Sequence, residues 1–222
     1  MTLAQEIAAY ASTLFDVVAA THLADGENLL IVGLESTPQH DLDEFRRVGG
    51  EFQLSGFEKH ARPKLESLLS FIHKQGFTAE LVGRWGYPRR GEIKLKEAAI
   101  RAGLGQWGKS TLVLHPRYGN RLRFMALGTD VPLEPPTGSL AIREENPSCT
   151  DCTICLDACP EKVLEPYRMP ETSLCLANMA RVTSKDGQLI PCDICLRLCP
   201  AGSNDEGLKK RPWQDSNPRP AA

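Results

Sequence analysis

The distribution of cysteine is the feature that most restricts how this chain can fold. All eight cysteines of the 222-residue sequence lie between positions 149 and 199. The first four form the run Cys149-x2-Cys152-x2-Cys155-x3-Cys159, followed by Pro160. This is the bacterial ferredoxin spacing, in which three thiolates at short intervals surround one [4Fe–4S] cube and the fourth binds a second cube. The pattern therefore predicts two iron–sulfur clusters.

The other four cysteines complete two sets of ligands. The run Cys192-x2-Cys195-x3-Cys199 repeats the latter part of the first run, but Leu189 stands where its first cysteine would be, so we expect Cys175 to supply that ligand. In two-cluster ferredoxins the last cysteine of each run binds the other cube. The expected ligands of cluster 1 are Cys149, Cys152, Cys155 and Cys199, and those of cluster 2 are Cys159, Cys175, Cys192 and Cys195.

Two zinc sites or structural disulfides are the alternative uses of these cysteines. Paired C-x2-C motifs also suit zinc, although zinc sites seldom need a third cysteine at the same interval. Disulfides suit an oxidising compartment, whereas the first 20 residues lack the basic segment of a secretory signal. No apolar run approaches the length of a membrane span. We therefore expect a cytoplasmic protein without a membrane partner.

A stretch rich in proline and glycine, residues 131–138, precedes the cysteines and predicts a domain boundary. We expect an α/β domain over residues 1–140, an iron–sulfur module over 141–201, and a polar, disordered tail over 202–222. The module has few large apolar residues, so clusters are expected to replace a hydrophobic core.

Apolar periodicity predicts an α+β or α/β fold for the first 140 residues. Helical spacing occurs over residues 3–18, 63–75 and 95–102, and short apolar runs at 29–32 and 79–82 predict strands. Two further runs, 111–114 and 122–127, are separated by a turn containing Pro116 and Gly119 and predict a β-hairpin. Helices that interleave with strands in this way indicate a mixed domain.

The stretch GLGQWGKS, residues 103–110, matches both the dinucleotide and the P-loop glycine patterns. Both motifs need a strand before the glycines and a helix after them, because the phosphate binds at the N-terminus of that helix. Here a predicted helix precedes the glycines and a strand follows. We therefore interpret Gly103 as a helix C-terminal cap. The stretch is either a capped turn or a surface that a large flat ligand can approach.

Two segments together resemble the epoxyqueuosine reductases and their relatives, the reductive dehalogenases. They are residues 95–135, with the AGLGQWGKS block, and the cysteine pattern of residues 149–200 with its lone Cys175. The resemblance implies a cobalamin-binding, nitroreductase-like domain followed by a bis-[4Fe–4S] ferredoxin-like module. It implies an oxidoreductase that passes electrons from an external donor, such as a ferredoxin or flavodoxin, through two clusters to a cobalamin or small substrate. The implied cobalamin contacts are Gly103, Leu104, Gly105, Gln106, Trp107, Gly108 and Lys109.

The sequence departs from this family at two places. A D-x-G-P-x-x-E stretch supplies the family's acidic proton donor, whereas Arg90 stands here at the Asp position and Lys96 lies near the Glu position. Only 23 residues follow Cys199, whereas the relatives often continue into helical repeats that help hold tRNA. The resemblance thus favours an oxidoreductase without that acidic donor, and it gives little reason to expect tRNA as a partner.

Tyr87, His115 and Tyr118 are candidate replacement donors because they lie near the glycine block in sequence. Such residues more often pack in the fold or lie on its surface. Trp107 is either a ring stacked on a cofactor or an ordinary partly buried tryptophan. The alternative to an enzyme is a non-catalytic electron-transfer partner, ferredoxin-type or corrinoid-reducing, whose first domain docks another protein.

Overall fold

The computed structural model describes residues 2–23, 26–48, 51–84, 86, 92–135, 145–175 and 192–202, which include all eight cysteines. The predicted boundary around residue 140, Tyr87, Arg90, Leu189 and the tail beyond residue 202 lie outside these ranges. None of the helices in the described ranges is long and apolar enough to cross a bilayer.

A four-stranded antiparallel sheet organises the first part of the chain. Its strand order is β1 (Val17–His22), β2 (Asn28–Glu35), β8 (Leu122–Thr129) and β5 (Ala79–Leu81). The central pair, β2 and β8, runs in register from Asn28 opposite Thr129 to Glu35 opposite Leu122. Most residues of both strands are buried, as expected for a sheet that is covered on both faces.

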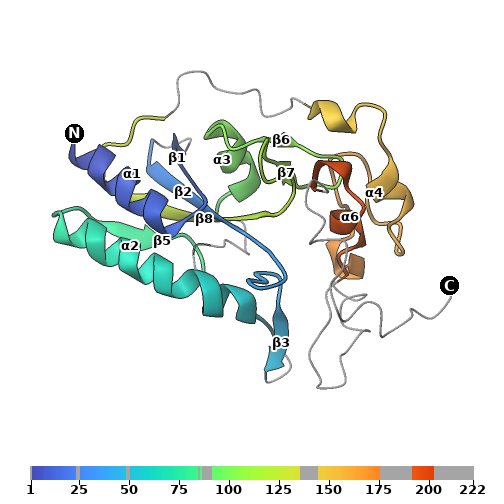
Figure 1. Ribbon diagram of the computed structural model, residues 1–222, viewed down its shortest axis with the longest axis horizontal. Coiled ribbons are helices and arrows are strands. Elements are labelled where there is room, and N and C mark those ends of the chain that lie inside the picture. Colours follow the sequence, from blue (N-terminus) through green and yellow to red (C-terminus); the bar gives the residue numbers. More distant parts are fainter. Residues whose placement is uncertain are drawn as a thin grey trace.

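Helices cover both faces of this sheet (Figure 1). On one face, α1 (Leu3–Leu14) and α2 (Arg62–Lys74) pack with Leu30, Val32 and Met125. On the other face, α3 (Leu95–Arg101) packs with Leu29, Ile31 and Phe124. Successive residues of β2 therefore enter opposite cores, as the alternation of an extended strand requires. A mixed fold is thus confirmed, and its sheet is antiparallel.

The helix ends follow local sequence. Thr2 caps α1 in a reciprocal capping box with Gln5, and Pro63 lies in the first turn of α2. The helix predicted over residues 3–18 ends early, at Leu14. Val18 lies in β1 instead, because the β-branched residues from Val17 onward favour an extended strand.

The predicted hairpin between residues 111–114 and 122–127 is wrong. Instead, β7 (Val113–Leu114) pairs with β6 (Gln106–Trp107), and β8 joins the central sheet. The apolar side chains of β8 enter both cores. Burial of both faces therefore outweighs pairing with the strand nearest in sequence. Sequence reasoning also missed the hairpin of β3 (Phe45–Val48) with β4 (Glu51–Leu54) and the π-helical turn η1 (Phe57–Ala61) before α2.

The cysteine region lies beside the β6–β7 ribbon, away from α1 and α2 (Figure 1). Its regular elements are short: η2 (Pro147–Cys149), α4 (Ile154–Asp157), α6 (Ile194–Arg197) and η3 (Pro200–Gly202). Its buried apolar groups form two small clusters, each of which contains cysteine. This region therefore depends on its cysteines for most of its interior.

Candidate functional site

Four thiols surround one cavity at the edge of the cysteine region. The cavity is small and partly open to solvent, and its walls contain Cys149, Cys152, Cys155 and Cys199 together with Lys109 and Ser110. Burial raises the pKa of the Cys155 thiol, and the charges of Cys199, Cys149 and Cys152 raise it further. Cys149 and Cys199 also pack against Leu114 of β7. The first quartet thus lies directly beside the glycine-rich turn.

The other four thiols form a second group. Burial raises the pKa of Cys195 to about 12, and the Cys192, Cys175 and Cys159 thiols also raise it. The pKa of Cys175 is raised by burial and then by Cys192 and Cys159. Cys155 of the first quartet contributes as well to the shift at Cys195, so the two groups are neighbours.

The structure brings together the same two sets of cysteines that the spacing predicts, including the exchanged Cys159 and Cys199. All eight thiols are free of disulfide bonds. Within the described ranges, no three His, Cys, Asp or Glu side chains converge closely enough to hold a single metal ion. Thiols that line one cavity can serve as ligands of a metal ion or of a polynuclear cluster.

The glycine-rich turn ends α3 as predicted. Gly103 has φ of +77°, and its N–H donates to the Ile100 carbonyl while the Leu104 N–H donates to the Ala99 carbonyl, which is a Schellman cap. At Gly105, φ is +142° and a Cβ would lie 2.4 Å from the Leu114 carbonyl oxygen. The space beside Gly105 is therefore occupied by the backbone of β7 and not by a ligand.

Burial divides the seven predicted cobalamin contacts into two groups. Leu104, Gly105 and Gly108 are buried. Gly103 is exposed, and Gln106, Trp107 and Lys109 are half-buried. Only this second group presents surface to a ligand.

The same turn forms a seam with the segment that carries the first cysteines. The Trp107 carbonyl accepts a hydrogen bond from the Asn146 N–H at 3.1 Å, and the Lys109 carbonyl accepts one from the Tyr167 N–H at 3.2 Å. Lys109 Nζ donates to the Thr150 carbonyl at 2.9 Å and lies 3.6 Å from Glu145 Oε1. The turn predicted to contact a cofactor is thus also hydrogen-bonded to the segment that carries the cysteines of the first quartet.

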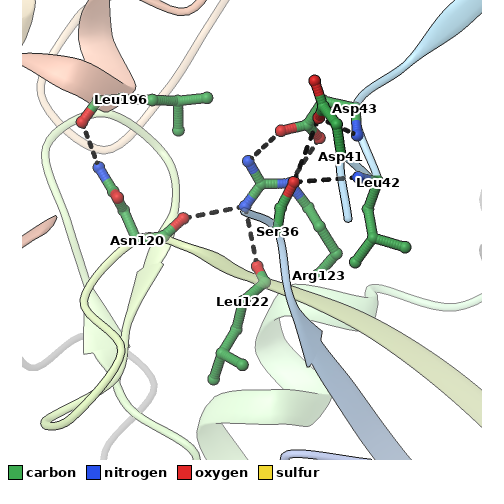
Figure 2. A network of polar contacts seen from close by, with 8 residues as sticks. All are labelled: Ser36, Asp41, Leu42, Asp43, Asn120, Leu122, Arg123 and Leu196. Carbon is green, nitrogen blue, oxygen red and sulfur yellow. Dashed lines mark hydrogen bonds and ion pairs between the residues drawn. The ribbon is translucent and has the colours of Figure 1, made fainter. Parts of the chain in front are cut away.

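A second connection reaches the other cysteine-bearing helix (Figure 2). The buried Asn120 side chain donates from Nδ2 to the Leu196 carbonyl in α6 at 2.9 Å. Arg123 Nη1 donates to the Asn120 carbonyl at 2.9 Å, and its Nε donates to Asp43 Oδ1 at 2.6 Å. Lys96 of α3 also faces this side: its side chain is exposed to solvent, but desolvation by neighbouring protein groups, and then the charge of Arg123, lower its pKa, while Cys195 opposes the shift.

The candidate proton donors have other roles where they are described. The His115 Nδ1 atom accepts hydrogen bonds from the Arg117 and Tyr118 N–H groups, at 3.0 and 3.3 Å. Burial, and then the charge of Arg117, lower the pKa of His115. The Tyr118 ring lies 5.1 Å from the His115 ring, and Tyr118 packs on the α3 core. Both residues thus build the turn before β8, and neither lines the cavity of the first quartet.

Sequence reasoning missed Tyr167, Glu145 and Asn120. The Tyr167 hydroxyl is buried and has no hydrogen-bond partner among the described residues, although the Glu145 carboxylate is nearby. Burial and then Glu145 raise the pKa of Tyr167, so the hydroxyl stays protonated beside Cys149 and Cys155. No local motif marks these residues, since their contacts span distant parts of the chain.

Comparison with known sequences confirms the predicted resemblance. The chain is 28% identical over 151 residues to an epoxyqueuosine reductase of Bacillus subtilis, covering 63% of this chain and 36% of that protein. It is 30% identical over 149 residues to an epoxyqueuosine reductase of Synechocystis, covering 62% of this chain and 48% of that protein. The chain thus spans less than half the length of these two relatives. No family model matches it.

Solved structures share the fold. An epoxyqueuosine reductase from Streptococcus thermophilus has a TM-score of 0.66 at 18% identity, covering 91% of this chain and 66% of that one. An epoxyqueuosine reductase crystallised with a modified tRNA stem loop has the same TM-score and covers 93% and 68%. A catabolic reductive dehalogenase has a TM-score of 0.63 at 16% identity, covering 91% and 32%. The mixed α/β fold is therefore that of epoxyqueuosine reductases and reductive dehalogenases.

Proposed function

We propose that the protein is an iron–sulfur oxidoreductase of the epoxyqueuosine reductase type, with two [4Fe–4S] clusters. The observation that carries this proposal is the division of eight thiols into two quartets, one of them around a cavity. Cys149, Cys152, Cys155 and Cys199 would hold cluster 1, and Cys159, Cys175, Cys192 and Cys195 would hold cluster 2. A nitroreductase-like domain over residues 1–140 and a ferredoxin-like module over 141–201 complete the proposed arrangement.

The chemistry of the thiols supports a cationic guest. Thiols must lose their protons to bind iron. Burial, and then the proximity of the other thiols, raises the pKa of Cys155, Cys175 and Cys195 when no metal is bound. Deprotonation of each quartet is therefore favoured when a positively charged core offsets the thiolate charge. When bound, such clusters supply single-electron transfer. Asn120 donates to Leu196, next to Cys195, and Lys109 donates to Thr150, next to Cys149. Both cysteine-bearing segments are therefore hydrogen-bonded to the first domain.

Metal analysis of anaerobically purified protein tests this proposal. We expect about eight irons and eight acid-labile sulfides per chain, and electron paramagnetic resonance signals of reduced [4Fe–4S] clusters after dithionite is added. Zinc without iron would contradict the proposal and support two structural zinc sites.

The proposed electron acceptor is a cobalamin or a small substrate between the two parts of the chain. Gly103, Gln106 and Trp107 offer the accessible surface of the turn, and one structure with this fold belongs to a B12-dependent dehalogenase. We expect reduced protein to retain hydroxocobalamin in a one-to-one complex through desalting. Reduction of epoxyqueuosine in tRNA is not part of the proposal, because Arg90 and Lys96 stand near the positions of the acidic residues that supply the family's proton donor.

A non-catalytic electron-transfer protein is the second candidate, and the packing of Gly105 and Gly108 against β7 favours it because no ligand is needed to explain these glycines. The large hydrophobic side chains that are exposed in the described ranges are Ile154, Leu174 and Leu198, and each directly precedes a cysteine. They provide apolar surface beside both quartets for a ferredoxin- or flavodoxin-like donor. Failure to retain cobalamin, together with fast electron transfer to an added acceptor protein, would support this candidate.

A further inference from the structure

Lys109 extends from the glycine-rich turn into the wall of the cavity that Cys149, Cys152, Cys155 and Cys199 surround. Its side chain is only 13% exposed, although it ends in an ammonium group. Its Nζ atom donates to the Thr150 carbonyl at 2.9 Å. Thr150 lies between the ligands Cys149 and Cys152, so this bond restrains the loop that joins them.

The charge of this ammonium is only partly offset by protein groups. A buried cation is costly unless it is paired. Its ion-pair partner, Glu145, lies 3.6 Å away, and the Glu145 side chain is 38% exposed, so solvent screens much of its charge. The side chains in this cavity that become anionic when they bind a cluster are the four thiols. The position of Lys109 is therefore explained by a bound cluster that, together with its four thiolate ligands, carries a net negative charge.

We propose that Lys109 is the electrostatic partner of cluster 1: its ammonium stabilises the reduced cluster, and its bond to Thr150 holds the ligand loop closed. This inference rests on the proposed function, in which the first quartet binds a [4Fe–4S] cluster. Reduction adds one electron from an external one-electron donor, and no bond is made or broken. A nearby positive charge favours the more negative state, so it raises the reduction potential.

A matched lysine in the same region provides the control. Lys162 also donates from Nζ to a main-chain carbonyl, that of Asp157. Unlike Lys109, it is exposed and does not line the cavity. Replacement of either residue by methionine removes one ammonium and one hydrogen bond to the cysteine segment. Only the change at Lys109 removes a charge from the cluster 1 cavity.

Redox titration of the iron-loaded protein, followed by electron paramagnetic resonance, tests the proposal. In Lys109→Met we expect the equilibrium constant for one-electron reduction of one cluster to fall about tenfold, which is about 59 mV. Iron release to a chelator should also be faster. Lys109→Arg should restore most of the potential, and Lys162→Met should leave both potentials unchanged. Unchanged potentials and iron release in Lys109→Met would overturn the proposal.

Lys109→Gln decides the question if Lys109→Met does not fold. It removes the charge but keeps a polar side chain, so the potential of the same cluster should fall as in Lys109→Met. An unchanged potential in Lys109→Gln would overturn the role of Lys109. Failure of the proposed function has a different signature, because wild-type protein would then contain no [4Fe–4S] cluster at all.

Discussion

The Asn120 side chain donates a hydrogen bond to the Leu196 carbonyl at 2.9 Å, across 76 residues of sequence. This bond joins the turn before the central strand β8 to the short helix α6 (Figure 2). Leu196 directly follows Cys195, so the sheet domain holds a predicted cluster 2 ligand through a main-chain contact. Arg123 supports Asn120 from the other side by donating to its carbonyl.

Removal of this contact should loosen cluster 2. Asn120→Ala removes the side-chain donor to the Leu196 carbonyl, which keeps only main-chain donors such as the Cys199 N–H at 3.4 Å, and the lost bond costs about 0.5–1.5 kcal/mol. We expect faster release of iron to a chelator than in wild-type protein, measured by absorbance. Asn28→Ala is the control, because it removes a similar bond from Asn28 Nδ2 to the Val131 carbonyl within the sheet domain. Equal release rates in both variants would contradict this prediction.

Pairs of cysteine substitutions test the crossed ligand sets. Cys149→Ser and Cys199→Ser alter thiols of the same quartet, so the double variant should retain about half of the iron, as each single variant does. Cys149→Ser combined with Cys159→Ser alters both quartets and should lose nearly all of it. The measurement is iron per chain after anaerobic purification. If the second pair retained half of the iron, Cys149 and Cys159 would belong to one cluster.

Gly105→Ala should be much more damaging than an alanine at another left-handed glycine. Its Cβ would lie 2.4 Å from the Leu114 carbonyl oxygen, and this backbone atom can move only if β7 moves. Gly26 has φ of +90° with open space around it, so Gly26→Ala costs only the conformational penalty of about 1–2 kcal/mol. We expect Gly105→Ala to lower the free energy of unfolding by at least about 2 kcal/mol more. Urea titration of both variants measures the difference, and similar values would refute the packing explanation.

His115 should make the protein less stable in acid. Its pKa is lowered from the ordinary value of 6.5, mainly by burial, so the folded state binds a proton less readily than the unfolded state. Its contribution to stability is therefore complete above pH 6.5 and is lost as the pH falls through the lower folded-state pKa. We expect the loss of stability between about pH 7.5 and 5.5 to be smaller in His115→Asn.

His22→Asn is the matched control, because His22 is an exposed histidine at the end of β1. The free energy of unfolding of His22→Asn, measured by circular dichroism, should change with pH as it does in wild-type protein. An equal slope in His115→Asn would show that protonation of His115 is not coupled to folding.

Much of the fold could be predicted because its signals are local. Buried helix faces repeat every three or four residues, which predicted α2 and α3 nearly to their observed ends. Gly103 lies at the left-handed position that ends α3. The hairpin prediction failed because turn residues between two apolar runs do not reveal which strand offers the larger buried surface. β8 is buried on both sides only when it lies next to β2.

The sequence by itself determined the ligand chemistry, because a cluster-binding run needs thiolates at short intervals and these intervals are visible along the chain. The neighbours of the ligands were decided only by the tertiary structure. Lys109 belongs to a glycine motif that suggests phosphate or cofactor binding, yet its ammonium lies in the wall of the first thiol cavity. Asn120 carries no motif, yet it holds α6. Electrostatic and hydrogen-bond partners depend on distance in space, and such distances follow from packing of the whole chain.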